Sequence, residues 1–186
     1  MGKVIVSADH TILQEFIIRE KLMRFDLQMI PITEKEPIIN IGENITLECF
    51  QVCHCECSRG CKLIIRNKDK QFSIGYSGDH SVTDDFGKNI QHVDLLIHEA
   101  TFIDEFEIND IREMGHSTFD EAIQFGKQFA DYTILTHLSS RYKSCEYDTS
   151  EPKILVAFDQ IGFDFEDINT FIPLVKKANL TTFASV

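Results

Sequence analysis

The chain has 186 residues, of which 43% are hydrophobic, and its formal net charge is −12. This length and apolar content suffice for one domain with a hydrophobic core, so we expect residues 1–186 to form a single domain. No apolar run approaches the roughly 18 residues of a membrane-spanning helix, which excludes that class of protein. The acidic balance argues against a broad nucleic-acid-binding face, which needs clustered Lys and Arg.

The first third of the chain predicts a short buried strand at Val4-Ile5-Val6 and a helix over residues 11–25, where apolar side chains follow helical spacing. An extended stretch over residues 27–32 ends near Pro31. The segment before Ser7 is too short for a secretory signal, so the six Cys are expected to be reduced thiols or metal ligands in an intracellular protein.

Four strands follow in the middle of the chain. They are expected at Ile45 to Cys53, Cys61 to Arg66, Gln71 to Tyr76 and Val93 to Ile97. A tight polar turn joins the second to the third. The only modest basic cluster, Lys62, Arg66, Lys68 and Lys70, surrounds this turn and is more typical of a solvated hairpin tip than of an RNA-binding surface.

The last third predicts a helix that begins at the N-cap Ser117 and runs to Ala130, followed by a strand from Tyr132 to Thr136. A closing pair of strands is expected at Ile154 to Phe158 and at Gly162 to Phe165, before a helix around 168–178 that Pro173 interrupts. The alternation of strands and helices indicates a layered α/β fold.

Histidine and carboxylate side chains repeatedly follow the ends of the apolar runs. The segments that carry them are Val52-Cys53-His54, Tyr76-Ser77-Gly78-Asp79, His98-Glu99-Ala100-Thr101, His116-Ser117-Thr118 and Leu135-Thr136-His137. Loops at strand ends are where functional residues usually lie. Imidazoles and carboxylates are typical zinc ligands, and phosphodiester hydrolysis favours two metal ions about 4 Å apart.

In the order of the segments and in the residues of each, they resemble the C-terminal half of tRNase Z, the metallo-β-lactamase-fold endoribonuclease that trims tRNA 3′ ends. The resemblance extends from Ser7 to about Pro173. It implies an αβ/βα sandwich, one or two zinc ions and a tRNA precursor as the substrate. Most of the first β-sheet half, and the arm with which the family grips tRNA, have no counterpart in this chain.

The resemblance also implies a set of metal ligands. His54 corresponds to the family's isolated ligand histidine, Asp79 to the bridging aspartate and His137 to the last histidine. Asp9 and His10 match the end of the family's His-x-His-x-Asp-His motif. The second metal site therefore keeps all four of its ligands.

The first metal site is incomplete, because the two leading histidines of that motif are absent. Without gaps, Ile5 and Ser7 stand in their places, which leaves only His54 and Asp79 for this ion. Nearby thiols could serve as additional ligands of this first metal ion. They are Cys53, Cys55, Cys57 and Cys61. Their spacing is not the paired Cys-x2-Cys pattern, so a separate zinc site and buried thiols both remain open. A strand through this region would place the first three thiols on one face, opposite His54.

Glu99 and His116 correspond to the family pair that relays a proton to the leaving 3′ oxygen. A carboxylate that holds an imidazole fixes its tautomer and stabilises the imidazolium. With Asp9, these are the catalytic residues that the resemblance implies.

The other histidines have plainer interpretations. His98 is structural in the family, His80 is more typical of a surface residue than of a ligand, and His92 of a solvated helix end. Arg141 could contact RNA phosphate or form a structural ion pair, and residues 157–159 could border the site or simply end a strand.

Two functions remain in competition. One is a divergent zinc-dependent endoribonuclease for tRNA trailers, which uses a second copy or a partner chain to cover the missing sheet. The other is a catalytically impaired subunit that binds a protein or RNA, and the sequence could also be a fragment of a longer product. In either case we expect the sheet face normally covered by the first half to be apolar.

Overall fold

The computed structural model describes residues 38–103, 108–142, 149–158, 162–164 and 167–178. The elements predicted within residues 1–37, and the predicted site residues Asp9 and His10, lie outside these ranges. Within them, no helix combines the length and the hydropathy needed to cross a membrane.

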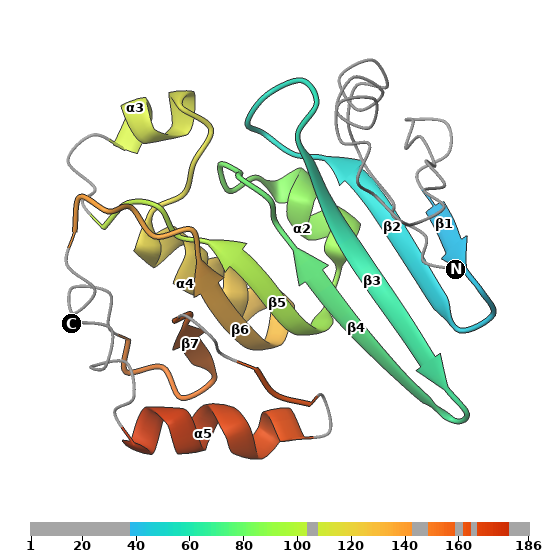
Figure 1. Ribbon diagram of the computed structural model, residues 1–186. Coiled ribbons are helices and arrows are strands. Elements are labelled where there is room, and N and C mark those ends of the chain that lie inside the picture. The colour runs from blue at the N-terminus through green and yellow to red at the C-terminus, as the bar shows by residue number, and fades with distance from the viewer. Residues whose placement is uncertain (1–37, 104–107, 143–148, 159–161, 165–166, 179–186) are drawn as a thin grey trace, which may run out of the picture.

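A single seven-stranded sheet forms the framework, and its strands lie side by side in chain order. The strands are β1 (Ile38–Ile41), β2 (Ile45–Gln51), β3 (Arg59–Asn67), β4 (Lys70–Tyr76), β5 (Val93–Glu99), β6 (Ala130–Thr136) and β7 (Ile154–Val156). Neighbours from β1 to β4 pair antiparallel, and those from β4 to β7 pair parallel (Figure 1). This mixed sheet confirms the predicted α/β class.

Helices cover both faces of the parallel part of the sheet. The helices α2 (Asp84–Ile90) and α4 (Phe119–Phe129) pack on one face, where Phe86 and Phe125 meet Leu96 of β5. The helix α5 (Ile168–Ala178) packs on the other, against the next residue of the same strand, Leu95. Adjacent strand residues point to opposite faces, so β5 is buried on both sides. The short helix α3 (Ile108–Glu113) precedes α4.

The face that carries α5 continues as rows of apolar side chains across the antiparallel strands, and Ile39 and Cys49 in these rows are buried within the chain. Strand register places Ile39, Leu47, Leu63 and Ile74 in one row with Leu95. A parallel row contains Cys49, Cys61 and Tyr76. Of these side chains, Tyr76 is the most exposed, at 45%. An apolar face is what was expected where a sandwich packs a second layer.

Several predicted boundaries need correction. β2 ends at Gln51 and not at Cys53, so the cysteines around His54 lie in a loop and share no strand face. The N-cap of α4 is Thr118 and not Ser117. Thr118 and Glu121 form a capping box, in which each side chain accepts a hydrogen bond from the other residue's backbone N–H.

The predicted closing pair of strands is also wrong. β7 pairs with β6 in parallel, whereas residues 162–164 belong to no strand. Pro173 does not interrupt α5, which continues to Ala178. No range was predicted for the short elements β1, α2 and α3, although the helix end expected at His92 agrees with the end of α2 at Ile90.

Candidate metal centre and acid–base pair

The predicted functional residues that the structure describes lie along one edge of the sheet. The parallel strands β4, β5 and β6 end at this edge, β2 ends there too, and β3 begins there (Figure 1). His54 therefore lies in the β2–β3 loop, Asp79 just after β4, Glu99 at the end of β5 and His137 just after β6. The loop before α4 adds His116.

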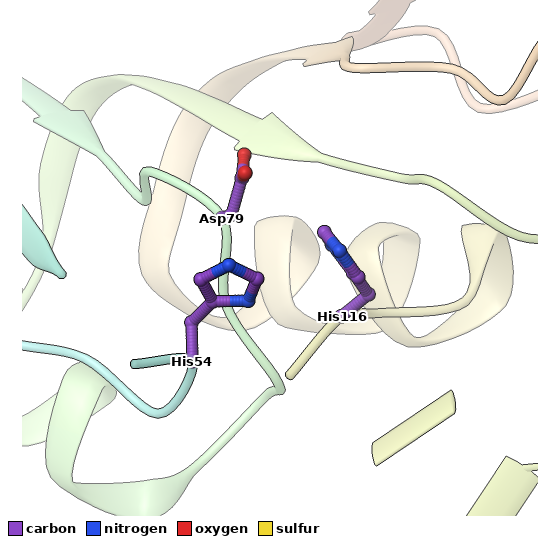
Figure 2. A group of neighbouring side chains, drawn as sticks. All are labelled: His54, Asp79 and His116. Atoms are coloured by element: carbon purple, nitrogen blue, oxygen red, sulfur yellow. The ribbon is translucent and has the colours of Figure 1, made fainter. Parts of the chain in front are cut away.

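The ends of these side chains form two overlapping groups. Potential ligand atoms of His54, Asp79 and His116 all lie within 4.8 Å of one another, and Figure 2 shows these three side chains on separate loops. Glu99, His116 and His137 form the second group by the same measure. Asp79 Oδ1 lies 3.5 Å from His137 Nε2, so this carboxylate approaches both groups.

Hydrogen bonds fix the orientation of two of the three imidazoles. His54 Nδ1 lies 2.9 Å from the carbonyl oxygen of Gly115 and must donate, because a carbonyl can only accept. His116 Nδ1 lies 2.8 Å from Glu99 Oε1 and donates to that carboxylate. Each ring consequently keeps its Nε2 lone pair for a metal or a substrate, as metal-binding histidines usually do.

The third imidazole is oriented through a hydroxyl. Thr101 Oγ1 lies 2.6 Å from Glu99 Oε2 and donates its hydrogen there. The same oxygen lies 2.8 Å from His137 Nδ1 and therefore accepts from it. His137 thus presents Nε2 towards Asp79. Thr101 belongs to the site in this supporting role, which sequence reasoning missed.

Glu99 is almost completely buried, with 1% of its surface exposed. Its Oε1 accepts from the backbone N–H of His80 at 2.7 Å, and its Oε2 from those of Thr101 and Ser117 at 3.2 Å each. A buried carboxylate needs such donors to offset its lost hydration. They also aim the carboxylate at His116, so the pair is rigid.

Unusual backbone conformations place the ligand side chains. Gly115 has φ +77°, and a Cβ there would lie 2.6 Å from the Cα of His54, so only glycine fits. Gly78 has φ +61°, and its Cβ would lie 2.8 Å from the carbonyl oxygen of Arg59. His137 itself has φ 55°, a strained value for a non-glycine residue that recurs at functional sites.

His80 is not the surface residue that was expected. It is fully buried, its ring packs 4.6 Å from that of Phe86, and neither ring nitrogen has a hydrogen-bond partner among the described residues. Burial, with a smaller contribution from His98, lowers the pKa of His80 to about 3. His98 is buried too, as its structural interpretation requires, and burial lowers its pKa.

The remaining candidates belong to neither of the two groups. Cys53, Cys55 and Cys57 are exposed and not buried thiols, and no cysteine of the described ranges joins either ligand group. Arg141 stacks over the ring of Phe102 at 5.5 Å. His92 is solvated, as expected, and pairs with Asp131 at 3.2 Å.

Arg66, Lys68 and Lys70 lie at the β3–β4 hairpin tip, at the end of β3 opposite the site (Figure 1). Lys62 instead pairs with Gly75, nearer the site end of the same strand. Lys62 and Arg66 bind neighbouring segments, through the carbonyl of Ile90 and the hydroxyl of Thr46. The cluster is therefore part of the hairpin and not of the candidate centre. A hollow of about 500 Å³ beside this tip is lined by Phe72 and Tyr132 among others, and by none of the predicted site residues that the structure describes.

The donor set fits zinc. Four ligands at about 2.0–2.2 Å around a tetrahedral zinc lie about 3.4 Å from one another. Because the ligand atoms of each group already lie within 4.8 Å of one another, only small side-chain adjustments would bring them to this spacing. Two imidazole nitrogens and a carboxylate oxygen are donors that zinc prefers. Asp79 and His137 are partly exposed, which leaves access for a substrate.

The comparisons with known proteins agree with this fold and site. Residues 9–138 match the model of the β-lactamase superfamily domain, and the chain belongs to that family, within which it is tRNase Z-like. It is 35% identical over 142 residues to mitochondrial ribonuclease Z of Drosophila melanogaster, covering 73% of this chain and 18% of that protein. It is 44% identical over 72 residues to ribonuclease Z of Pyrobaculum islandicum, covering 38% and 25%.

A solved structure is similar as well. Human tRNase Z, short form, superimposes with a TM-score of 0.53 and 28% identity, covering 74% of this chain and 51% of that one. The metallo-β-lactamase fold is therefore confirmed. Because the chain spans only 18% and 25% of the length of the two curated relatives, their whole-protein activities do not transfer directly.

Proposed function

We propose that this chain is a metal-dependent phosphodiesterase domain that acts on tRNA precursors at their 3′ trailers. One observation carries the proposal: His54, His116 and His137 are each held through Nδ1, which leaves Nε2 of each ring available, and all three rings lie near Asp79. Structural histidines have no need of a common orientation around a carboxylate. The ribonuclease Z names of the relatives support tRNA as the substrate class.

The proposed zinc ligands are His54, Asp79 and His137, together with Asp9 and His10 from the family resemblance. Bound zinc would supply polarisation of the phosphodiester and an activated water. The protein's own contribution is to position these ligands and to exclude other orientations of the three rings.

The proposed general acid is His116, which donates a proton from Nε2 to the leaving 3′ oxygen. Glu99 holds Nδ1 at 2.8 Å and stabilises the imidazolium before the transfer. A potential ligand atom of His116 also lies close enough to those of His54 and Asp79 for the three to share one metal ion. His116 cannot bind metal and deliver a proton through Nε2 at once, and its buried carboxylate partner favours the acid role.

A second candidate function is a non-catalytic subunit that binds a protein or RNA. The absent leading histidines, the charge of −12 and the position of Arg66, Lys68 and Lys70 at the hairpin tip, at the other end of β3 from the site, favour it. Metal stoichiometry separates the two functions, because two equivalents of zinc per chain support the enzyme and one or none supports the subunit.

Cleavage of labelled precursor tRNA by the purified chain with zinc or manganese tests the proposal. We expect very slow cleavage, because residues 1–186 supply only His54 and Asp79 to the first metal and the net charge of −12 gives little counterion release on binding RNA. Residual activity should disappear in Glu99→Gln and His116→Asn and persist in the solvated control His92→Asn. Complete inactivity together with absent zinc binding would refute the enzyme, and robust multiple turnover would refute the expected weakness.

A further inference from the structure

Two thiols lie side by side in the β2–β3 loop. Cys55 Sγ and Cys57 Sγ are 3.6 Å apart, and both side chains are exposed. Cys55 Sγ also lies 2.9 Å from Ser58 Oγ. Nothing in the proposed catalytic site uses either sulfur.

The backbone of the loop holds the two thiols together. The N–H of Ser58 donates to the carbonyl of Cys55 at 3.0 Å and closes a turn around Glu56 and Cys57. The Arg59 guanidinium donates to the carbonyls of Glu56 and Ser58 at 3.0 and 2.9 Å. Forming an S–S bond of about 2.05 Å from this arrangement takes a movement of about 1.5 Å, within reach of side-chain rotation.

The other described thiols are less suited to exchange. Cys49 and Cys61 face each other across β2 and β3, but Cys49 is only 6% exposed. Burial raises the pKa of the Cys61 thiol to about 11, which keeps it protonated and unreactive. Cys53 is exposed in the same loop and offers a matched control.

We propose that Cys55 and Cys57 form a dithiol–disulfide couple that exchanges with low-molecular-weight disulfides of the glutathione type. In the first step one protein thiol displaces one thiol from the small disulfide and forms a mixed disulfide. The second protein thiol then attacks the protein sulfur of that bond and releases the other small thiol. The protein loses two protons and two electrons, and the small disulfide gains both.

This inference is independent of the phosphodiesterase proposal, because it uses no metal and no RNA. The couple nevertheless adjoins the candidate metal centre, since His54 precedes Cys55 directly. The N–H of Ser81 also ties the carbonyl of Cys53 to the segment after Asp79, at 2.9 Å. Oxidation therefore constrains the loop that carries a proposed ligand.

The peptide between the two sulfurs provides a direct test, because Glu56 separates Cys55 from Cys57. The reduced full chain is incubated with oxidised glutathione, its remaining thiols are alkylated, and it is cleaved by a protease that cuts after glutamate. We expect mass spectrometry to find the two peptides joined by a bond from Cys55 to Cys57 and separated by reduction.

Serine variants make the assignment. Cys55→Ser and Cys57→Ser should each lose the linked peptides, whereas Cys53→Ser should retain them. All three positions are exposed, so the variants keep the core. A link that persists in Cys55→Ser, a link that involves Cys53 or Cys61, or only glutathione adducts on the unaltered chain would overturn the proposal.

Discussion

Asp79 lies beside proposed metal ligands from both groups, which also share His116. Its carboxylate lies with His54 and His116 and approaches His137 at 3.5 Å. We expect Asp79→Ala to remove bound zinc more completely than His54→Ala, because the carboxylate serves both groups and the imidazole only one. Metal content after dialysis, measured by emission spectroscopy, checks this order, and equal losses would contradict it.

Gly115 supports His54 without any side chain of its own. Gly115→Ala should displace the His54 ring, because its Cβ would lie 2.6 Å from His54 Nδ1. We expect zinc affinity to fall about tenfold or more, the range seen when a supporting contact of a metal ligand is lost. Zinc titration against a competing chelator measures the change.

Gly42 is the matched control for this substitution. It also has a positive φ, of 70°, but its Cβ would meet nothing within 4 Å. Gly42→Ala therefore adds the same kind of backbone strain without touching the centre. If both variants lost affinity equally, strain and not the clash with His54 would be the cause.

At the scale of elements, the helix layer contains a pH-sensitive core. His80 and His98 pack against Phe86 of α2, and His98 also packs against Phe125 of α4. In the folded chain the pKa of His80 is about 3 and that of His98 is lowered, against about 6.5 when unfolded. Below pH 6.5 the unfolded chain binds protons that the folded chain excludes.

We therefore expect the stability that these histidines contribute to be complete above pH 6.5 and to decline as the pH falls towards 3. For His80 the decline is about 1.4 kcal/mol per pH unit. Urea unfolding in chelator at several pH values measures it. His80→Leu should make the unfolding free energy depend less steeply on pH. Phe86→Leu should lower the unfolding free energy but leave its dependence on pH unchanged. An unchanged slope in His80→Leu would refute this account.

Strands were easier to predict than short helices, for a physical reason. β2 to β6 alternate or concentrate apolar residues over seven to nine positions, which gave their location within about two residues. α2 has only seven residues, although Thr83 caps it and two acidic residues open it. The predicted strand after Gly162 failed because local apolar content does not supply a pairing partner.

The site was predictable in its members but not in its geometry. Chain order places His54, Asp79 and His137 after strands, and a sheet in that order brings them to one edge. The contacts through Gly115 and Thr101 depend on loop conformations that no periodicity encodes. His80 was misplaced because a polar residue after Gly-Asp suggests a surface, whereas here its ring fills the core.

For the whole molecule, the apolar sheet face leads us to predict association through its half-buried and exposed side chains, since Ile39 and Cys49 are already buried within the chain. The rows of side chains over β1 to β4 continue the surface that α5 covers farther along the sheet. We expect the chain to self-associate through this face, with a concentration-dependent mass in sedimentation equilibrium. Tyr76→Ser, at its most exposed position, should weaken association, because it removes apolar surface from the interface.

Leu174 provides the control. Its side chain is 63% exposed, but it lies on α5 and not on the sheet face formed by β1 to β4. Leu174→Ser should leave the association unchanged. A monomeric mass at all concentrations, or equal weakening in both variants, would exclude the antiparallel strands as the interface.

The order of the strands also sets the order in which the molecule can be assembled during synthesis. Because each strand pairs with its predecessor in the chain, a strand that leaves the ribosome finds its neighbour already made. Asp79 and Glu99 are in place early, but the candidate centre waits for β6 to deliver His137. The growing chain therefore carries a nearly finished sheet before it can hold its complete ligand set.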